Sequence, residues 1–78
     1  MKVGVRVELA DGGLVDGLLT DEHSASSYGL PVLVIDGVPY GPRDQYDGWP
    51  ISRLLIDADA GEEVFDAAQR AGWVVQGC

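Results

Sequence analysis

Residues 28–42, YGLPVLVIDGVPYGP, carry the strongest folding signal in the chain. They join the most apolar run, 31–35, to a shorter apolar run, 38–40, through Asp36-Gly37. Asp-Gly between two β-prone runs predicts a two-residue hairpin, because a type I′ turn needs positive φ at both central residues. We therefore place a β-hairpin in the middle of the fold, with Pro39 confining its second strand to an edge or to a single ladder position.

The first twenty residues predict a second hairpin. In residues 2–9, KVGVRVEL, apolar side chains alternate with small or polar ones, which is typical of a half-buried strand. Turn-forming residues follow at 10–13, and residues 14–20 return as the next strand. Gly17, in the middle of that strand, indicates a bulge or a close neighbour.

The next part of the chain predicts two loops and one further strand. Residues 21–29 are small and polar, and residues 41–50 combine chain-breaking residues with two aromatic ones, so we predict a loop at each. Residues 51–57 contain three consecutive large aliphatic side chains. They are most simply a short buried fifth strand, with a helical turn as the alternative.

One helix is predicted near the C-terminus. Asp59 is placed to cap its start, and Glu62 can complete a capping box. A single apolar stripe runs along this helix, made by Val64, Phe65, Ala68 and Ala71. Gly72 predicts the helix end in a left-handed conformation, with Trp73 folding back on the last turn. Residues 73–75 then either add a last short strand or close the core.

Together these elements predict one α+β domain that spans residues 1–78. Its sheet is mostly antiparallel, has about five strands, and is covered on its apolar face by the single C-terminal helix. A small SH3-like or OB-like barrel closed by that helix is the competing architecture, because it buries the same residues.

Charge and composition limit the partners of the chain. With 13 acidic against 5 basic residues, the formal net charge is −8, which repels phosphate backbones and anionic membranes and favours basic surfaces. No apolar run approaches the roughly 18 residues of a membrane span, and no signal-peptide pattern is present, so we expect a soluble cytoplasmic protein. Cys78 is the only cysteine, which fits a reducing compartment. The absence of Asn and the single Lys against four Arg indicate a GC-rich source, and we expect the protein in a bacterial host cell.

The acids are densest between residues 57 and 66, where no base interrupts Asp57, Asp59, Glu62, Glu63 and Asp66. One interpretation is purely structural, because acids in the first turn of a helix complement its dipole and solvate an exposed face. Two observations favour a binding role. Glu62 and Asp66 are like charges four residues apart, which is mildly unfavourable in a helix, and acids elsewhere keep the whole chain negative. Such a surface could occupy a groove that normally holds a phosphate backbone.

Three catalytic or metal-binding interpretations fail on composition and spacing. The spacing Asp57-x-Asp59-x-Gly61 suggests calcium, but an EF-hand loop needs glycine at its sixth position and glutamate at its twelfth. His23 has serines and acids only as sequence neighbours, and such neighbours rarely form a triad. With one histidine and one cysteine, a zinc site is not expected either. We therefore predict that the protein is not an enzyme and that it needs no metal or other cofactor.

Aromatic residues gather around the predicted loops. Tyr28, Tyr40, Tyr46 and Trp49 fall in or beside them, with Arg43 among them, and we expect the four rings to lie near one another. A cluster packed under a loop explains this placement. The functional alternative is a set of interface anchors, because Tyr, Trp and Arg dominate binding hot spots. On that interpretation Tyr46, Trp49 and Arg43 join the acidic run in contacting a partner.

In size, acidity, lack of catalytic motifs and α+β plan, the chain resembles small phage-encoded anti-defence proteins, anti-CRISPRs among them. This resemblance spans the chain and rests on general character, so the contact residues are named from this sequence alone. It implies a protein–protein inhibitor whose anionic surface mimics nucleic acid and blocks a complex with a basic groove, such as a CRISPR surveillance complex. The alternative is a small homodimeric structural or assembly module without catalytic activity, in which the acidity serves solubility.

Overall fold

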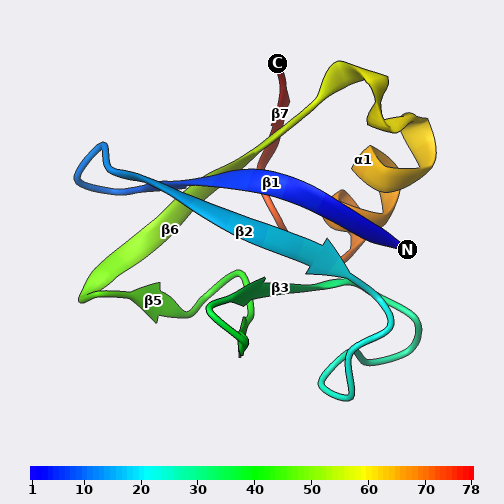
Figure 1. The fold of residues 1–78 in the computed structure, drawn as a ribbon, viewed down its shortest axis with the longest axis horizontal. Coiled ribbons are helices and arrows are strands. Elements are labelled where there is room, and N and C mark those ends of the chain that lie inside the picture. The colour runs from blue at the N-terminus through cyan, green and yellow to red at the C-terminus, as the bar shows by residue number, and fades with distance from the viewer.

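One sheet of seven strands organises the protein, whose residues 1–78 are all described by a computed structural model (Figure 1). Its strands are β1 (Lys2–Leu9), β2 (Leu14–Thr20), β3 (Val32–Ile35), β4 (Val38–Tyr40), β5 (Gln45–Tyr46), β6 (Trp49–Ile56) and β7 (Val75–Gly77). A 3-10 helix, η1 (Ala58–Ala60), and one α-helix, α1 (Glu62–Arg70), separate β6 from β7. The strand order is β4-β3-β2-β1-β6-β5, and β7 pairs with β6 outside this path.

The predicted α+β class is confirmed, and the sheet is not a closed barrel. Neighbouring strands are antiparallel except for β6 and β7, which run parallel. β7 runs parallel to β6 because η1 and α1 carry the chain back along β6. β7 then starts beside Leu54 and runs in the same direction as β6. The strand number exceeds the expected five by β5 and β7.

Two Asp-Gly turns close two hairpins. Asp36 and Gly37 have φ of 52° and 78°, as the type I′ prediction requires, and they join β3 to β4. Asp47 and Gly48 have φ of 53° and 81° and join β5 to β6 in the same way. The prediction of a loop over residues 41–50 is therefore wrong in its second half. The same turn chemistry was present there, flanked by aromatic residues that favour strands.

The core lies on one face of the sheet, which we call the inner face. The alternation predicted for β1 places its apolar residues there, opposite those of β2 and β6. Gly17 is needed for this packing, because a Cβ at that position would lie 2.9 Å from Leu33 Cδ1 and 3.2 Å from Val7 Cγ2. The register of β1 and β2 continues unbroken past Gly17. The close neighbour is therefore the correct alternative, and the bulge is not.

The predicted start of the helix is wrong by two residues. The side chain of Asp57, not that of Asp59, caps this region by accepting a hydrogen bond from the Asp59 N–H at 2.8 Å, and it opens η1. Gly61, at φ 98°, then precedes α1, whose N-cap has no side-chain hydrogen bond. A short 3-10 turn competes well here because an Asp side chain bonds readily to the backbone two residues ahead.

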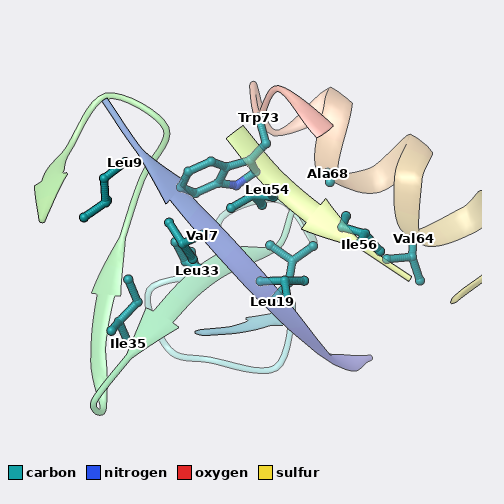
Figure 2. Close-up of a cluster of buried hydrophobic side chains, with 11 residues drawn as sticks. Val7, Leu9, Leu19, Leu33, Ile35, Leu54, Ile56, Val64, Ala68 and Trp73 are labelled. Atoms are coloured by element: carbon teal, nitrogen blue, oxygen red, sulfur yellow. The ribbon is translucent and has the colours of Figure 1, made fainter. Parts of the chain in front are cut away.

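The predicted end of the helix is confirmed. Gly72 has φ of 100°, and its N–H donates to the Gln69 carbonyl at 3.0 Å. The N–H of Trp73 donates to the Ala68 carbonyl at 3.0 Å, which completes a Schellman motif. This reversal carries Trp73 into the core, where it is 5% exposed and its ring lies beside Leu54 (Figure 2). The C-terminal segment thus both closes the core and adds the strand β7.

Candidate functional site

The five acids of the predicted run all lie at one end of the molecule, at the end of β6, in η1 and on α1 (Figure 1). All five are exposed. Glu62 and Glu63 occupy the first turn of α1, where the helix dipole favours negative charge. We call this surface the acidic end: Asp57, Asp59, Glu62, Glu63 and Asp66.

Four of the five carboxylates of the acidic end have no basic partner. Only Asp66 forms an ion pair, with Arg70 one turn further along α1. In the whole protein, the acids in ion pairs are Glu8, Asp21, Glu22 and Asp66, out of thirteen. The charge of the acidic end is therefore largely uncompensated, and its potential extends into solvent toward any basic surface nearby.

The aromatic anchors lie around the β5–β6 hairpin. Tyr46 and Trp49 are directly opposite each other across the hairpin, and Trp49 is 46% exposed. Tyr46 is half-buried and meets Tyr40 edge-to-face, with ring centroids 5.7 Å apart. Arg43 precedes β5 by two residues, is exposed, and forms no ion pair. Tyr28 does not join this cluster, contrary to expectation, because its side chain is fully exposed.

The two groups of predicted contact residues are separated by the length of β6. Trp49 begins this strand and Asp57 follows it directly, at opposite ends of the same ribbon in Figure 1. Eight residues of extended chain span about 26 Å at the rise of a β-strand. The structure therefore forms two patches, and a partner must cover nearly the whole molecule to touch both.

A third surface, on the face of the sheet opposite the core, was not identified from the sequence. Across this face Gly4, Leu18, Val34 and Pro39 are successive cross-strand neighbours and form an apolar row. Leu18 is 36% exposed, and a Cβ on Gly4 would meet no heavy atom within 4 Å. We call this surface the open face. Besides the row, it includes Lys2, Arg6, Glu8, Leu14, Asp16, Arg53 and Leu55.

The open face is hollowed beside the apolar row. A depression of about 440 Å³ has Gly4, Arg6, Asp16 and Leu55 in its lining, together with Asp57 and Cys78. A signal for this surface did exist, because β2 carries leucines on both faces.

The chain start is held by a small cluster of charges. The ammonium group of Met1 donates to Asp21 Oδ1 at 2.6 Å and lies 3.1 Å from Glu22 Oε2. The hydrogen bonds that this ammonium donates to Asp21 first and Glu22 second raise its pKa above the ordinary 8.0. The bond to Met1 lowers the pKa of Asp21 below 3.8. This cluster fastens β1 to the segment after β2.

The polar side chains of the segment after β2 and of the loop after β4 make local hydrogen bonds. A groove of about 360 Å³ lies between the segment after β2 and the end of β4, but its polar side chains serve local bonds: Ser26 donates to the Thr20 carbonyl, and Asp44 accepts from the Gly41 N–H. His23 Nδ1 accepts a hydrogen bond from the Ala25 N–H at 3.0 Å. No group of three or more His, Cys, Asp or Glu side chains is placed to hold a metal ion.

Comparison with protein-family models, with curated proteins and with solved structures found no match for this chain. The structure contains no helix with the length and apolar character needed to cross a membrane. The functional inference therefore rests on the three surfaces described above: the acidic end, the aromatic hairpin and the open face.

Proposed function

We propose that this protein is an inhibitor that binds the basic groove of a nucleic-acid-binding complex, such as a CRISPR surveillance complex, in the cytoplasm of a bacterial host. The acidic end takes the place of the phosphate backbone in that groove. The observation that carries the proposal is that four exposed carboxylates at one end of the molecule have no basic partner within the protein. Charges left uncompensated in the free protein can be compensated only by a partner or by mobile ions.

The energetics of such a site favour a charged partner over an apolar one. Exposed ion pairs contribute about 0.2–1 kcal/mol each, so three or four of them change affinity by roughly threefold to a thousandfold. They also accelerate encounter with an oppositely charged surface, and both effects weaken with salt. Trp49 adds an exposed aromatic side chain at the far end of β6, which a large partner can reach as a second contact.

Three acids suit a test by charge removal, because no ion pair or side-chain hydrogen bond uses them. These are Asp59, Glu62 and Glu63, and a triple variant D59N/E62Q/E63Q removes three negative charges without removing an ion pair or a side-chain hydrogen bond. The matched control is D11N/D36N/D47N, which removes the same charge from turns between strands. Asp36 and Asp47 have positive φ, which Asn adopts readily, and Asp11 accepts only a local bond from Gly13 N–H that an Asn oxygen can replace.

The experiment is affinity capture from a bacterial lysate by the wild type and both variants, with parallel washes at low and high salt and identification by mass spectrometry. We expect the wild type and the control variant to retain a nucleic-acid-binding complex that high salt or added duplex DNA releases. The variant D59N/E62Q/E63Q should retain it about tenfold less well, which is a loss of about 1.4 kcal/mol. Equal retention by both variants and the wild type at low salt would exclude the acidic end as the binding site.

A second candidate function is a structural or assembly module that acts as a homodimer. The observation that favours it is the open face, which exposes Leu18 and Leu14 on a sheet that no helix covers on that side. On this reading the acidity keeps the assembled protein soluble. Sedimentation across a range of protein concentrations tests it, because a homodimer dissociates on dilution and a monomer does not change.

A further inference from the structure

The open face differs from the rest of the surface in charge. Its bases are Lys2, Arg6 and Arg53, and its acids are Glu8 and Asp16 together with Asp57 in the lining of the depression. With Asp57, which the depression shares with the acidic end, three bases and three acids make the formal charge of the open face and its depression zero. The entire net charge of −8 therefore lies on the remaining surface, where only Arg43 and Arg70 oppose ten acids.

This distribution of charge indicates which partner can bind the open face. A basic partner gains more from the acidic end and the other acidic surfaces than from a neutral face. A second copy of this chain carries the same charge of −8, so it is repelled from every part of the surface except the neutral one. The apolar row across β1, β2, β3 and β4 then provides the area that such a contact buries.

The charges on the open face also satisfy the requirement of two-fold symmetry. A symmetric dimer places the same patch on both sides, so each patch must complement itself. Arg6 and Asp16 are direct cross-strand neighbours, yet neither belongs to an ion pair within the protein. Both groups therefore remain available to a partner. Glu8, by contrast, already binds Arg53, whose Nε lies 3.0 Å from its Oε1.

We propose that two copies of this chain form a two-fold symmetric dimer through their open faces. Leu18 and Val34 pack near the centre, and Arg6 of each protomer pairs with Asp16 of the partner subunit. A standard interface takes about 800 Å² from each protomer, which is about a sixth of the 4725 Å² of this chain. This inference rests on the second candidate function and specifies its surface. It is independent of the inhibitor proposal, since the dimer leaves most of the acidic end exposed.

The test measures the mass of the purified protein by light scattering and sedimentation equilibrium, up to about 1 mM protein and at about 0.15 M salt, where the Debye length is about 8 Å. A reductant is present because Cys78 is exposed and could otherwise cross-link two chains. We expect a reversible monomer–dimer equilibrium. The variant L18E should raise the dimer Kd at least tenfold, whereas the control Y28E, at a fully exposed side chain, should leave it unchanged.

Charge reversal distinguishes the proposed pairing from a simple effect of net charge. R6D makes the chain more negative and D16R makes it less negative, so net repulsion predicts opposite effects on the dimer Kd. The pairing of Arg6 with Asp16 of the partner subunit predicts that each single reversal weakens the dimer several-fold and that R6D/D16R restores it. Far-UV circular dichroism and thermal unfolding of each variant show that it is folded.

Two outcomes would overturn the proposal, and they differ in what else they remove. A monomer at every concentration would exclude both the open-face dimer and the homodimeric module. A dimer whose Kd is the same in the wild type, L18E and the two single reversals would keep the module but exclude the open face as its interface. Neither outcome affects the inhibitor proposal, which the capture experiment tests separately.

Discussion

Leu18 and Leu19 are adjacent in sequence and lie on opposite faces of the sheet. Leu19 is 0% exposed and packs in the core, whereas Leu18 is 36% exposed on the open face (Figure 2 shows Leu19). The two residues have the same side chain and the same strand, so neither composition nor strand propensity separates them. The difference arises because α1 and Trp73 cover the inner face, whereas on the other face the segment after β2 buries Thr20 and Val32 but leaves Leu18 exposed. A sheet face becomes a core only when something is placed upon it.

Replacing each of the two leucines by alanine tests this comparison directly. L19A should lower the free energy of unfolding by about 2–5 kcal/mol, because it removes buried methyl groups and leaves a cavity. L18A should lower it by only about 1 kcal/mol, since Leu18 is already 36% exposed to water and lies outside the buried core cluster. Urea unfolding of dilute protein measures both. Equal losses would show that the open face is also covered in the folded protein.

Two strand glycines offer a second test of the same kind. G17A should destabilise the fold by about 1–3 kcal/mol, because the new Cβ meets Leu33 and Val7 on the inner face. G4A should be neutral or stabilising by up to about 1 kcal/mol, since its Cβ meets open space and alanine reduces the freedom of the unfolded chain. The two melting temperatures, measured in parallel, decide this. A loss of stability in G4A would contradict the described open face.

Trp73 tests what covers the inner face. Its indole Nε1 is buried and has no hydrogen-bond partner, so the replacement W73F removes no hydrogen bond. We expect W73F to cost only about 1 kcal/mol, from the smaller volume of the ring, and W73A to cost about 3–5 kcal/mol. Denaturant unfolding of the two variants measures both losses of unfolding free energy. A cost for W73F close to that for W73A would mean that the indole group makes a specific contact.

The smallest expected effect on stability comes from the charges that hold the start of β1 to the segment after β2. Because the pKa of Asp21 is lowered, its contribution to stability is present above 3.8 and is lost as pH falls through the folded pKa. Because the pKa of the Met1 ammonium is raised, its contribution is present below 8.0 and is lost as pH rises through the folded pKa. The stability difference between the wild type and D21N should therefore form a plateau between these limits. A difference independent of pH would show that the bond does not form.

Much of the fold could be predicted because its signals are local. The strand of residues 2–9, the turn at Asp36-Gly37 and the helix end at Gly72 all follow from backbone preferences within a few residues. The start of α1 was predicted two residues too early, because Asp59 is a good cap residue by type but does not cap α1 in the structure. The side chain of Asp57 instead accepts a hydrogen bond from the Asp59 N–H and opens η1, so α1 begins only after Gly61.

The candidate site was predicted in part. The acids of residues 57–66 were expected on an exposed helix start, and they are exposed there. Their distance from Trp49 could not be predicted, because it depends on residues 49–56 forming one continuous strand rather than a loop and a shorter strand. The open face was missed for a related reason. It is composed of residues from several strands, and only the register brings them together.

The sequence by itself determined the alternation of the strands, the two Asp-Gly turns, the end of the helix and the net charge of −8. These properties depend on the conformational preferences and charges of neighbouring residues. Only the tertiary structure decided which of two apolar faces became the core, that β7 runs parallel to β6, and that the neutral surface lies opposite the core. These depend on residues far apart in the chain, whose positions are set by strand pairing and by the burial of Trp73.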